Sequence, residues 1–181
     1  MPKRLLLLLP LLSSCEDATT DLFPALPPVH LPAATQAGAN TFGFLVNGQP
    51  WEASNSPTLD GRVLTPTARF AHGELRLAAF RRLEVEGPVS NICLVAAGVT
   101  GPGVYPLAGG EDAARTATLG TTDHQLTRAS GTLVITRLET AGPHPLVAGR
   151  FELRASSDNS HSNQPAAIQV SEGRFDVQLA R

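Results

Sequence analysis

Residues 173–179 read Gly173-Arg174-Phe175-Asp176-Val177-Gln178-Leu179, which is the most regular alternation of apolar and polar residues in the chain. Successive side chains of a β-strand point to opposite faces of a sheet. Phe175, Val177 and Leu179 are therefore predicted to face a core, and the residues between them to face outward. The stretch predicts a half-buried β-strand.

A second stretch, Gly149-Arg150-Phe151-Glu152-Leu153, repeats the residue order of Gly173-Arg174-Phe175-Asp176-Val177. If the two strands pair antiparallel, we expect their outward arginines and acidic residues to lie opposite each other as cross-strand ion pairs. The glycine that begins each stretch predicts a bulge or a bend.

The rest of the chain after residue 40 consists of short apolar runs separated by glycine and proline. Residues 41–46 lead into Asn47-Gly48, a strong hairpin signal, and the β-branched, apolar run 133–138 predicts a buried strand. The 16 glycines and 15 prolines leave little room for helices, and only residues 111–117 suggest a short one. We expect an all-β domain over residues 41–181, an antiparallel β-sandwich or flattened barrel of roughly nine or ten short strands.

The chain begins with features of a secretory signal peptide. Lys3 and Arg4 precede an apolar run that only Pro10 interrupts, and small residues follow in Leu12-Ser13-Ser14-Cys15. The run is much shorter than the ~20 residues that a membrane-spanning helix needs. A cysteine directly after small residues resembles the lipobox of bacterial lipoproteins, in which that cysteine is acylated and becomes the new N-terminus. We expect a signal peptide over residues 1–14 and lipidation of Cys15, with an ordinary cleaved signal peptide as the alternative.

Residues 15–40 are predicted to form a tether. Four prolines interrupt this segment and favour an extended polyproline II conformation; they are Pro24, Pro27, Pro28 and Pro32. Glu16 and Asp17 follow Cys15 directly, and acidic residues at this place resemble a surface-export signal of Bacteroidetes lipoproteins; a solvated start of the linker is the alternative. The expected location is the outer membrane, facing either the periplasm or the exterior.

The charge balance bears on the partners of the protein. Of the 14 basic residues, Lys3 and Arg4 lie in the expected signal peptide, so 12 remain against 16 acidic residues, a net charge of about −4. Such a chain lacks the basic footprint of a nucleic-acid-binding protein. We therefore expect no nucleic-acid partner, and contact with the membrane through the lipid on Cys15.

The sequence predicts no catalytic residue, no metal site and no cofactor. The five histidines form no His-x-His or His-Glu-x-x-His pattern. The polar cluster 158–163 has oxygen-bearing residues at calcium-loop spacing but lacks the glycine and glutamate of that motif, so a hairpin tip is the preferred interpretation. Residues 98–103 are rich in glycine, but without the lysine of a phosphate-binding loop they predict a turn.

Three further residues are candidates for a reactive or ligand-binding role: Cys93, Trp51 and Tyr105. Cys93 lies in an apolar, strand-like run, so a buried inert thiol is expected rather than a reactive one. Trp51 and Tyr105 are the only tryptophan and tyrosine, and their flat rings suit the stacking of a sugar or a peptide. For both rings, packing in the core is the preferred alternative.

Several stretches together resemble a family of small Bacteroidetes lipoproteins of unknown function, common in Hymenobacter-like bacteria. The most specific are Leu31-Pro32-Ala33-Ala34-Thr35 and Gly38-Ala39-Asn40-Thr41-Phe42-Gly43, followed by Leu45-Val46-Asn47-Gly48 with Trp51. Shorter matches are Gly103-Val104-Tyr105-Pro106-Leu107, residues 130–136, and the two Gly-Arg-Phe triplets. The resemblance implies a β-rich lipoprotein domain and brings no catalytic residues.

Two functions remain open on the sequence. The first is a non-catalytic binding or structural module of the cell envelope, whose ligand is a glycan, a peptide or another envelope protein. The alternative is a hydrolase of envelope or extracellular polymers, with acidic or histidine residues brought together from separate strands. A groove on one sheet face, without a cluster of perturbed titratable groups, would favour the binding module.

Overall fold

The computed structural model describes residues 29–54, 65–82, 89–108, 114–121, 125–126, 128–156 and 167–180. Its strands are β1 (Thr41–Val46), β2 (Gln49–Glu52), β3 (Thr67–Ala71), β4 (Glu74–Arg82), β5 (Val89–Ala96), β6 (Gly103–Leu107), β7 (Arg115–Thr121), β8 (Gln125–Leu126), β9 (Arg128–Glu139), β10 (Leu146–Ser156) and β11 (Ala167–Gln178). No helix occurs in these ranges, and so none that is long and apolar enough to cross a membrane.

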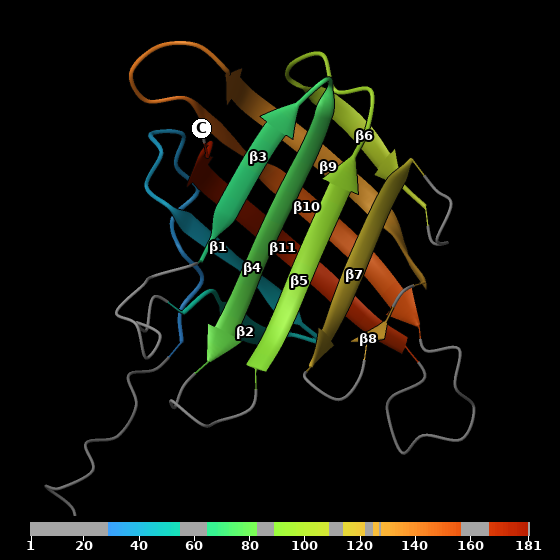
Figure 1. Ribbon diagram of the computed structural model, residues 1–181. Helices are drawn as coiled ribbons and strands as arrows, with labels where there is room; N and C mark the ends of the chain where they lie inside the picture. The colour runs from blue at the N-terminus through green and yellow to red at the C-terminus, as the bar shows by residue number, and fades with distance from the viewer. Residues whose placement is uncertain are drawn as a thin grey trace, which may run out of the picture.

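The strands form two antiparallel sheets that pack face to face (Figure 1). The six-stranded sheet has the order β2-β1-β11-β10-β9-β6, and the five-stranded sheet the order β3-β4-β5-β7-β8. Figure 1 shows the five-stranded sheet in front, with the strands of the other sheet running across it behind. The predicted all-β sandwich is therefore confirmed, as two separate sheets rather than a closed barrel.

The core lies between the two sheets and is rich in phenylalanine. Phe42 is at the centre, with ring centroids 5.2 Å from Phe151 and 6.3 Å from Phe175. Leucines and isoleucine from β4 and β5 cover these rings from the other sheet. As the alternation in residues 173–179 predicts, Phe175 and Val177 are buried in this core.

The predicted turn at Asn47-Gly48 and a second turn at His72-Gly73 form tight hairpins. Asn47 and Gly48 have φ angles of 48° and 82°, and His72 and Gly73 have 51° and 76°. Positive φ at both central residues is the mark of the type I′ turn that joins twisted antiparallel strands. Turn chemistry in the sequence thus sets the register of β1 with β2 and of β3 with β4.

The short helix suggested for residues 111–117 is wrong where the structure describes this stretch. Residues 115–117 belong to β7, which pairs with β5 inside the five-stranded sheet. Ala117 and Leu119 are buried while Thr116 and Thr118 alternate with them, and β-branched residues favour a pleated, half-buried strand. Pairing within the sheet therefore overrides a weak local helix preference.

Candidate functional site

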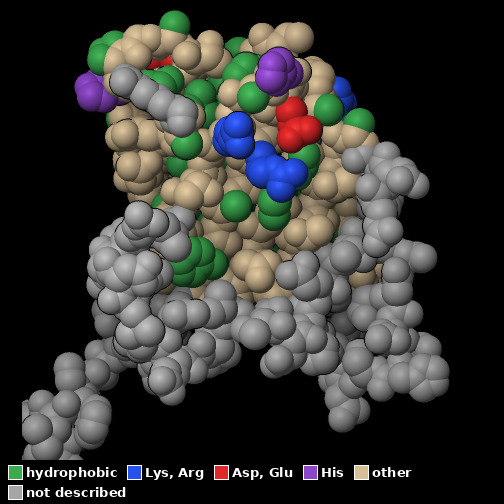
Figure 2. All heavy atoms as spheres, in the orientation of Figure 1, with side chains coloured by type: hydrophobic (Ala, Val, Ile, Leu, Met, Phe, Trp, Pro, Cys, Tyr) green, Lys and Arg blue, Asp and Glu red, His purple; other side chains and the backbone are tan. Residues whose placement is uncertain are grey.

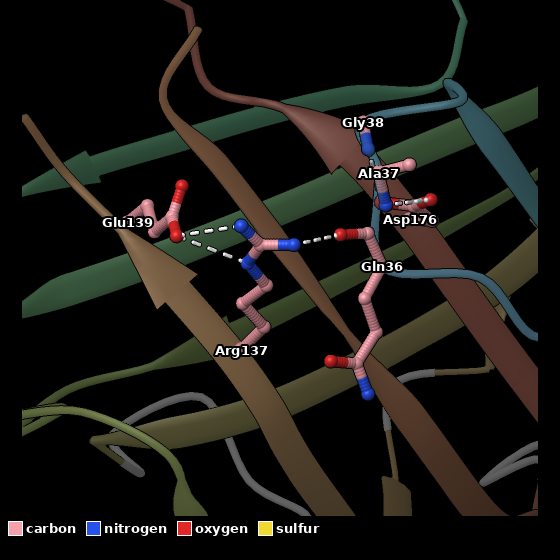
Figure 3. Close-up of polar contacts among 6 residues, drawn as sticks. All are labelled: Gln36, Ala37, Gly38, Arg137, Glu139 and Asp176. Carbon is pink, nitrogen blue, oxygen red and sulfur yellow. Dashed lines mark hydrogen bonds and ion pairs between the residues drawn. The ribbon is translucent and has the colours of Figure 1, made fainter. Parts of the chain in front are cut away.

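Residues 29–40, which we call the strap, lie against the outer face of the six-stranded sheet. Their main anchor is Asp176 of β11, a carboxylate with 0% exposure on a face that would otherwise be open to water. Thr35 donates its hydroxyl hydrogen to Oδ2 at 2.6 Å. The backbone N–H groups of Ala37, Gly38 and Ala39 donate to the same carboxylate at 2.8, 2.7 and 3.2 Å. Figure 3 shows Ala37 and Gly38 beside Asp176.

Three successive amides around one carboxylate form an anion-binding nest. Gly38 has a φ of 74°, a left-handed conformation that glycine adopts without strain. Burial by itself raises the pKa of Asp176, but the hydrogen bonds from Thr35 and the three amides outweigh it and hold the pKa below its ordinary value. Asp176 is therefore a charged structural anchor.

Further contacts fasten the middle and the C-terminal end of the strap. Arg137 of β9 donates to the carbonyl oxygen of Gln36 and pairs with Glu139 at 2.7 Å (Figure 3). Asn40 Oδ1 accepts the backbone N–H of Gln178 at 2.9 Å. The tether expected over residues 15–40 is thus docked from residue 29 onward, because its polar backbone binds the sheet. Cys15 and the signal peptide lie outside the described residues.

A groove with a volume of about 720 Å³ runs beside the strap on this outer face, which is turned away from the viewer in Figure 1. It is lined by the strap and by three neighbouring strands, through residues 34–36, Thr132, Val134, Thr136, 149–152 and 172–174. The strap forms one wall and β9 another, while β10 and β11 form the floor. The Asp176 anchor therefore fixes one wall of the groove, since Thr35 belongs to both.

The floor of the groove contains the repeated Gly-Arg-Phe triplets. In the register of β10 with β11, Gly149 faces Phe175, Arg150 faces Arg174, and Phe151 faces Gly173. Each phenylalanine ring lies over the glycine of the other strand on the core side. The two arginines are consequently opposite each other on the outer side, so the Arg-to-acid cross-strand pairs expected from the sequence are wrong.

The two arginines differ in their partners. Arg174 donates to the Glu172 carboxylate at 2.9 Å and to the carbonyl oxygen of Pro32 at 3.4 Å. Arg150 is exposed and has no hydrogen bond or ion pair with any residue that the structure describes. Glu152, two residues further along β10, likewise has no such partner there. The groove thus presents one free guanidinium and one free carboxylate.

Trp51 and Tyr105 lie away from this groove and are each only 8% exposed. The Trp51 ring stacks on Phe44 with centroids 4.6 Å apart, and its Nε1 donates to Ser90 Oγ at 2.8 Å. The Tyr105 hydroxyl donates to the Gly101 carbonyl oxygen at 2.7 Å. Neither ring leaves a free face for a ligand, so both fit the core alternative and not the stacking role.

The other candidates assemble no chemical centre in the described ranges. Burial raises the pKa of the free Cys93 thiol, which the positive charge of Arg76 only partly offsets, so its nucleophilic thiolate is disfavoured. No group of three His, Cys, Asp or Glu suited to a metal ion occurs among those residues. Residues 97–98 and 101–102 bend ahead of β6, as the turn interpretation predicts. The cluster 158–163 lies outside the described residues.

Sequence reasoning missed the groove. The run 133–138 was expected to be a buried strand, yet only Leu133 and Ile135 are buried, whereas Val134 and Thr136 line the groove. The sequence feature that could have indicated the groove is the Gly-Arg-Phe repeat. When the two triplets pair antiparallel with their arginines opposite each other, both arginines lie on the same face of the sheet.

Fold and site together define a two-sheet antiparallel β-sandwich with a groove that contains charged side chains on one outer face. No family model, curated protein or solved structure matches this chain. Its function is therefore inferred from the geometry of the described residues.

Proposed function

We propose that this protein is a lipid-anchored cell-envelope module that binds a glycan non-catalytically in the groove beside the strap. The observation that supports this most directly is the free Arg150 guanidinium within a preformed groove of about 720 Å³. Concave sites with a few placed polar groups are where proteins bind small ligands. Among the described residues, the groups whose pKa is shifted are Cys93 and Asp176, and neither lines the groove.

A hydrolase is the second candidate, and one observation favours it. Glu152 and Glu172 come from adjacent strands and line the same groove, and most glycosidases use two carboxyl groups. Glu172, however, is already engaged in an ion pair with Arg174 at 2.9 Å, so it is not a free carboxyl group for a substrate. Binding is therefore the better-supported function.

The role of the groove in binding is tested with a substitution that fills it. A Val134→Trp variant of the Cys15→Ser chain is expected to lose retention on immobilised polysaccharides that retain the Cys15→Ser chain, because the indole occupies the groove. The panel contains neutral polymers (dextran, laminarin, xylan) and acidic ones (alginate, polygalacturonate). Val95→Trp is the matched control, since Val95 is also half-buried on an outer sheet face, that of the five-stranded sheet.

Three outcomes contradict the proposal in this panel. Retention of no polymer removes the glycan-binding function, and equal retention by both tryptophan variants moves it away from the groove. Release of soluble reducing sugar from a bound polymer favours the hydrolase instead.

The lipid anchor has its own test, which also bears on the proposed kinship with Bacteroidetes lipoproteins. In cells fed a labelled palmitate, the wild-type protein is expected to carry the label and Cys15→Ser to lack it, because Cys15 is the acylation site. Cys93→Ser, which removes the other cysteine, should keep the label. Label that persists in Cys15→Ser would contradict lipidation at this position.

A further inference from the structure

On the groove floor, the positive charge of Arg150 has no described acidic partner. Like charges directly opposite each other on paired strands destabilise a sheet, and Arg150 faces Arg174 in the β10–β11 register. Glu172 neutralises Arg174, whereas nothing in the described part of the chain neutralises Arg150. An anionic group bound at Arg150 would remove this repulsion.

We propose that the groove selects a polysaccharide that carries carboxylates, a polymer of uronic acids, and that Arg150 pairs with a carboxylate of the sugar. This inference rests on the proposed binding function of the groove. The guanidinium offers two parallel N–H donors that match the two oxygens of a carboxylate. Because Arg150 is exposed and free, no existing contact has to break before the ligand binds.

The rest of the lining fits a sugar better than a peptide. Thr132, Thr136 and Gln36 carry polar side chains that suit sugar hydroxyls. The floor is the face of a sheet whose backbone groups are already paired between β10 and β11, so a peptide cannot add to it as a strand.

The lining also favours an acidic sugar over a neutral one. Stacking of a neutral sugar needs an exposed aromatic face, and the aromatic residue among the described lining residues, Phe151, is only 1% exposed. The chain's one tryptophan and one tyrosine are buried elsewhere. Binding must then come from charge-assisted hydrogen bonds, for which Arg150 is the free donor.

Glu152 further restricts the charge density that the ligand can have. It lies two residues from Arg150 on the same strand, and hence on the same face about 6.6 Å along the strand. Its carboxylate accepts hydrogen bonds from sugar hydroxyls but repels a second nearby anion. The pair therefore suits a polymer with one carboxylate per sugar and disfavours a dense polyanion such as polyphosphate.

The test compares two forms of one polymer on the Cys15→Ser chain. Polygalacturonate is expected to bind about tenfold more tightly than its fully methyl-esterified form, the change expected from one charge-assisted pair. Arg150→Gln should abolish this preference, and Arg150→Lys should keep part of it. Arg69→Gln is the matched control, because Arg69 is exposed and faces Arg76 across β3 and β4. These strands belong to the other sheet, whose outer face shows basic and acidic side chains in Figure 2.

The outcomes separate the inference from the proposed function. If polygalacturonate and its methyl-esterified form bind equally well, and Val134→Trp binds neither, the acidic-sugar inference is overturned while the groove remains the binding site. A preference that survives in Arg150→Gln places the recognition elsewhere and also overturns it. Tighter binding of polyphosphate than of polygalacturonate shows a general anion site instead. Binding of neither form, with no retention in the wider panel, overturns the proposed function itself.

Discussion

Asp176→Asn is expected to lower the free energy of unfolding by about 3 kcal/mol at neutral pH and to release the strap. The carboxylate accepts one hydroxyl and three amide hydrogens through its two oxygens, and in asparagine one of these oxygens is replaced by an NH₂ group that cannot accept them. Hydrogen bonds to a charged group contribute ~1.5–3 kcal/mol, and unsatisfied buried donors add to the loss. Urea unfolding gives the total, and hydrogen exchange at the amides of residues 37–39 reports on the strap.

The pH dependence of the stability difference shows whether the charge of Asp176 causes it. Because the pKa of Asp176 is lowered in the folded protein, its stabilisation is complete above the unfolded value of about 3.9. It is lost as the pH falls through the folded-state pKa. The difference between the wild-type protein and Asp176→Asn should therefore be largest near neutrality and shrink in acid.

Glu139→Gln serves as the control for the strap. Glu139 pairs with Arg137, which also holds the strap, but both side chains are largely exposed, so we expect a loss below about 1 kcal/mol. If amide exchange at residues 37–39 is the same in Asp176→Asn as in the wild type, Asp176 is not the anchor.

The alternation predicts correctly which face of the sheet the Asp176 side chain points to, but not what surrounds the side chain there. Alternation with Phe175 and Val177 places it on the outer face, where a charged residue is ordinarily solvated. The strap covers it instead, and no periodicity in residues 29–40 announces that contact. The prolines predict an extended chain, but the amides that bind Asp176 come from residues 37–39, where the chain bends and Gly38 has a φ of 74°. Long-range polar contacts of this kind leave no local pattern.

The register of β10 with β11 shows why the expected ion pairs fail. A shift of two residues would place Arg150 opposite Asp176 and Glu152 opposite Arg174, but also Phe151 opposite Phe175. The observed register places each ring over a glycine within the core. Exposed cross-strand pairs contribute only ~0.2–1 kcal/mol each, less than the burial of a phenylalanine ring, at ~1.5–3 kcal/mol. Core packing therefore decides the register and leaves Asp176 available for the strap.

Gly149→Ala tests this account and is expected to destabilise the domain by about 3 kcal/mol, or to prevent its folding. A Cβ atom at this position would lie 2.1 Å from the Val134 carbonyl oxygen and 2.7 Å from Cζ of Phe175. The carbonyl belongs to the backbone of β9 and cannot rotate away as a side chain would. Thermal and urea unfolding measure the loss.

Gly101→Ala is the matched control, because a Cβ atom there meets nothing within 4 Å. It should change stability by less than about 0.5 kcal/mol. If Gly149→Ala is as stable as Gly101→Ala, the close approach of β9 and the Phe175 ring does not fix the register. The opposed arginines on the groove floor would then need another cause. If Gly149→Ala is destabilised as expected, the same packing that builds the core also places Arg150 in the groove without a partner.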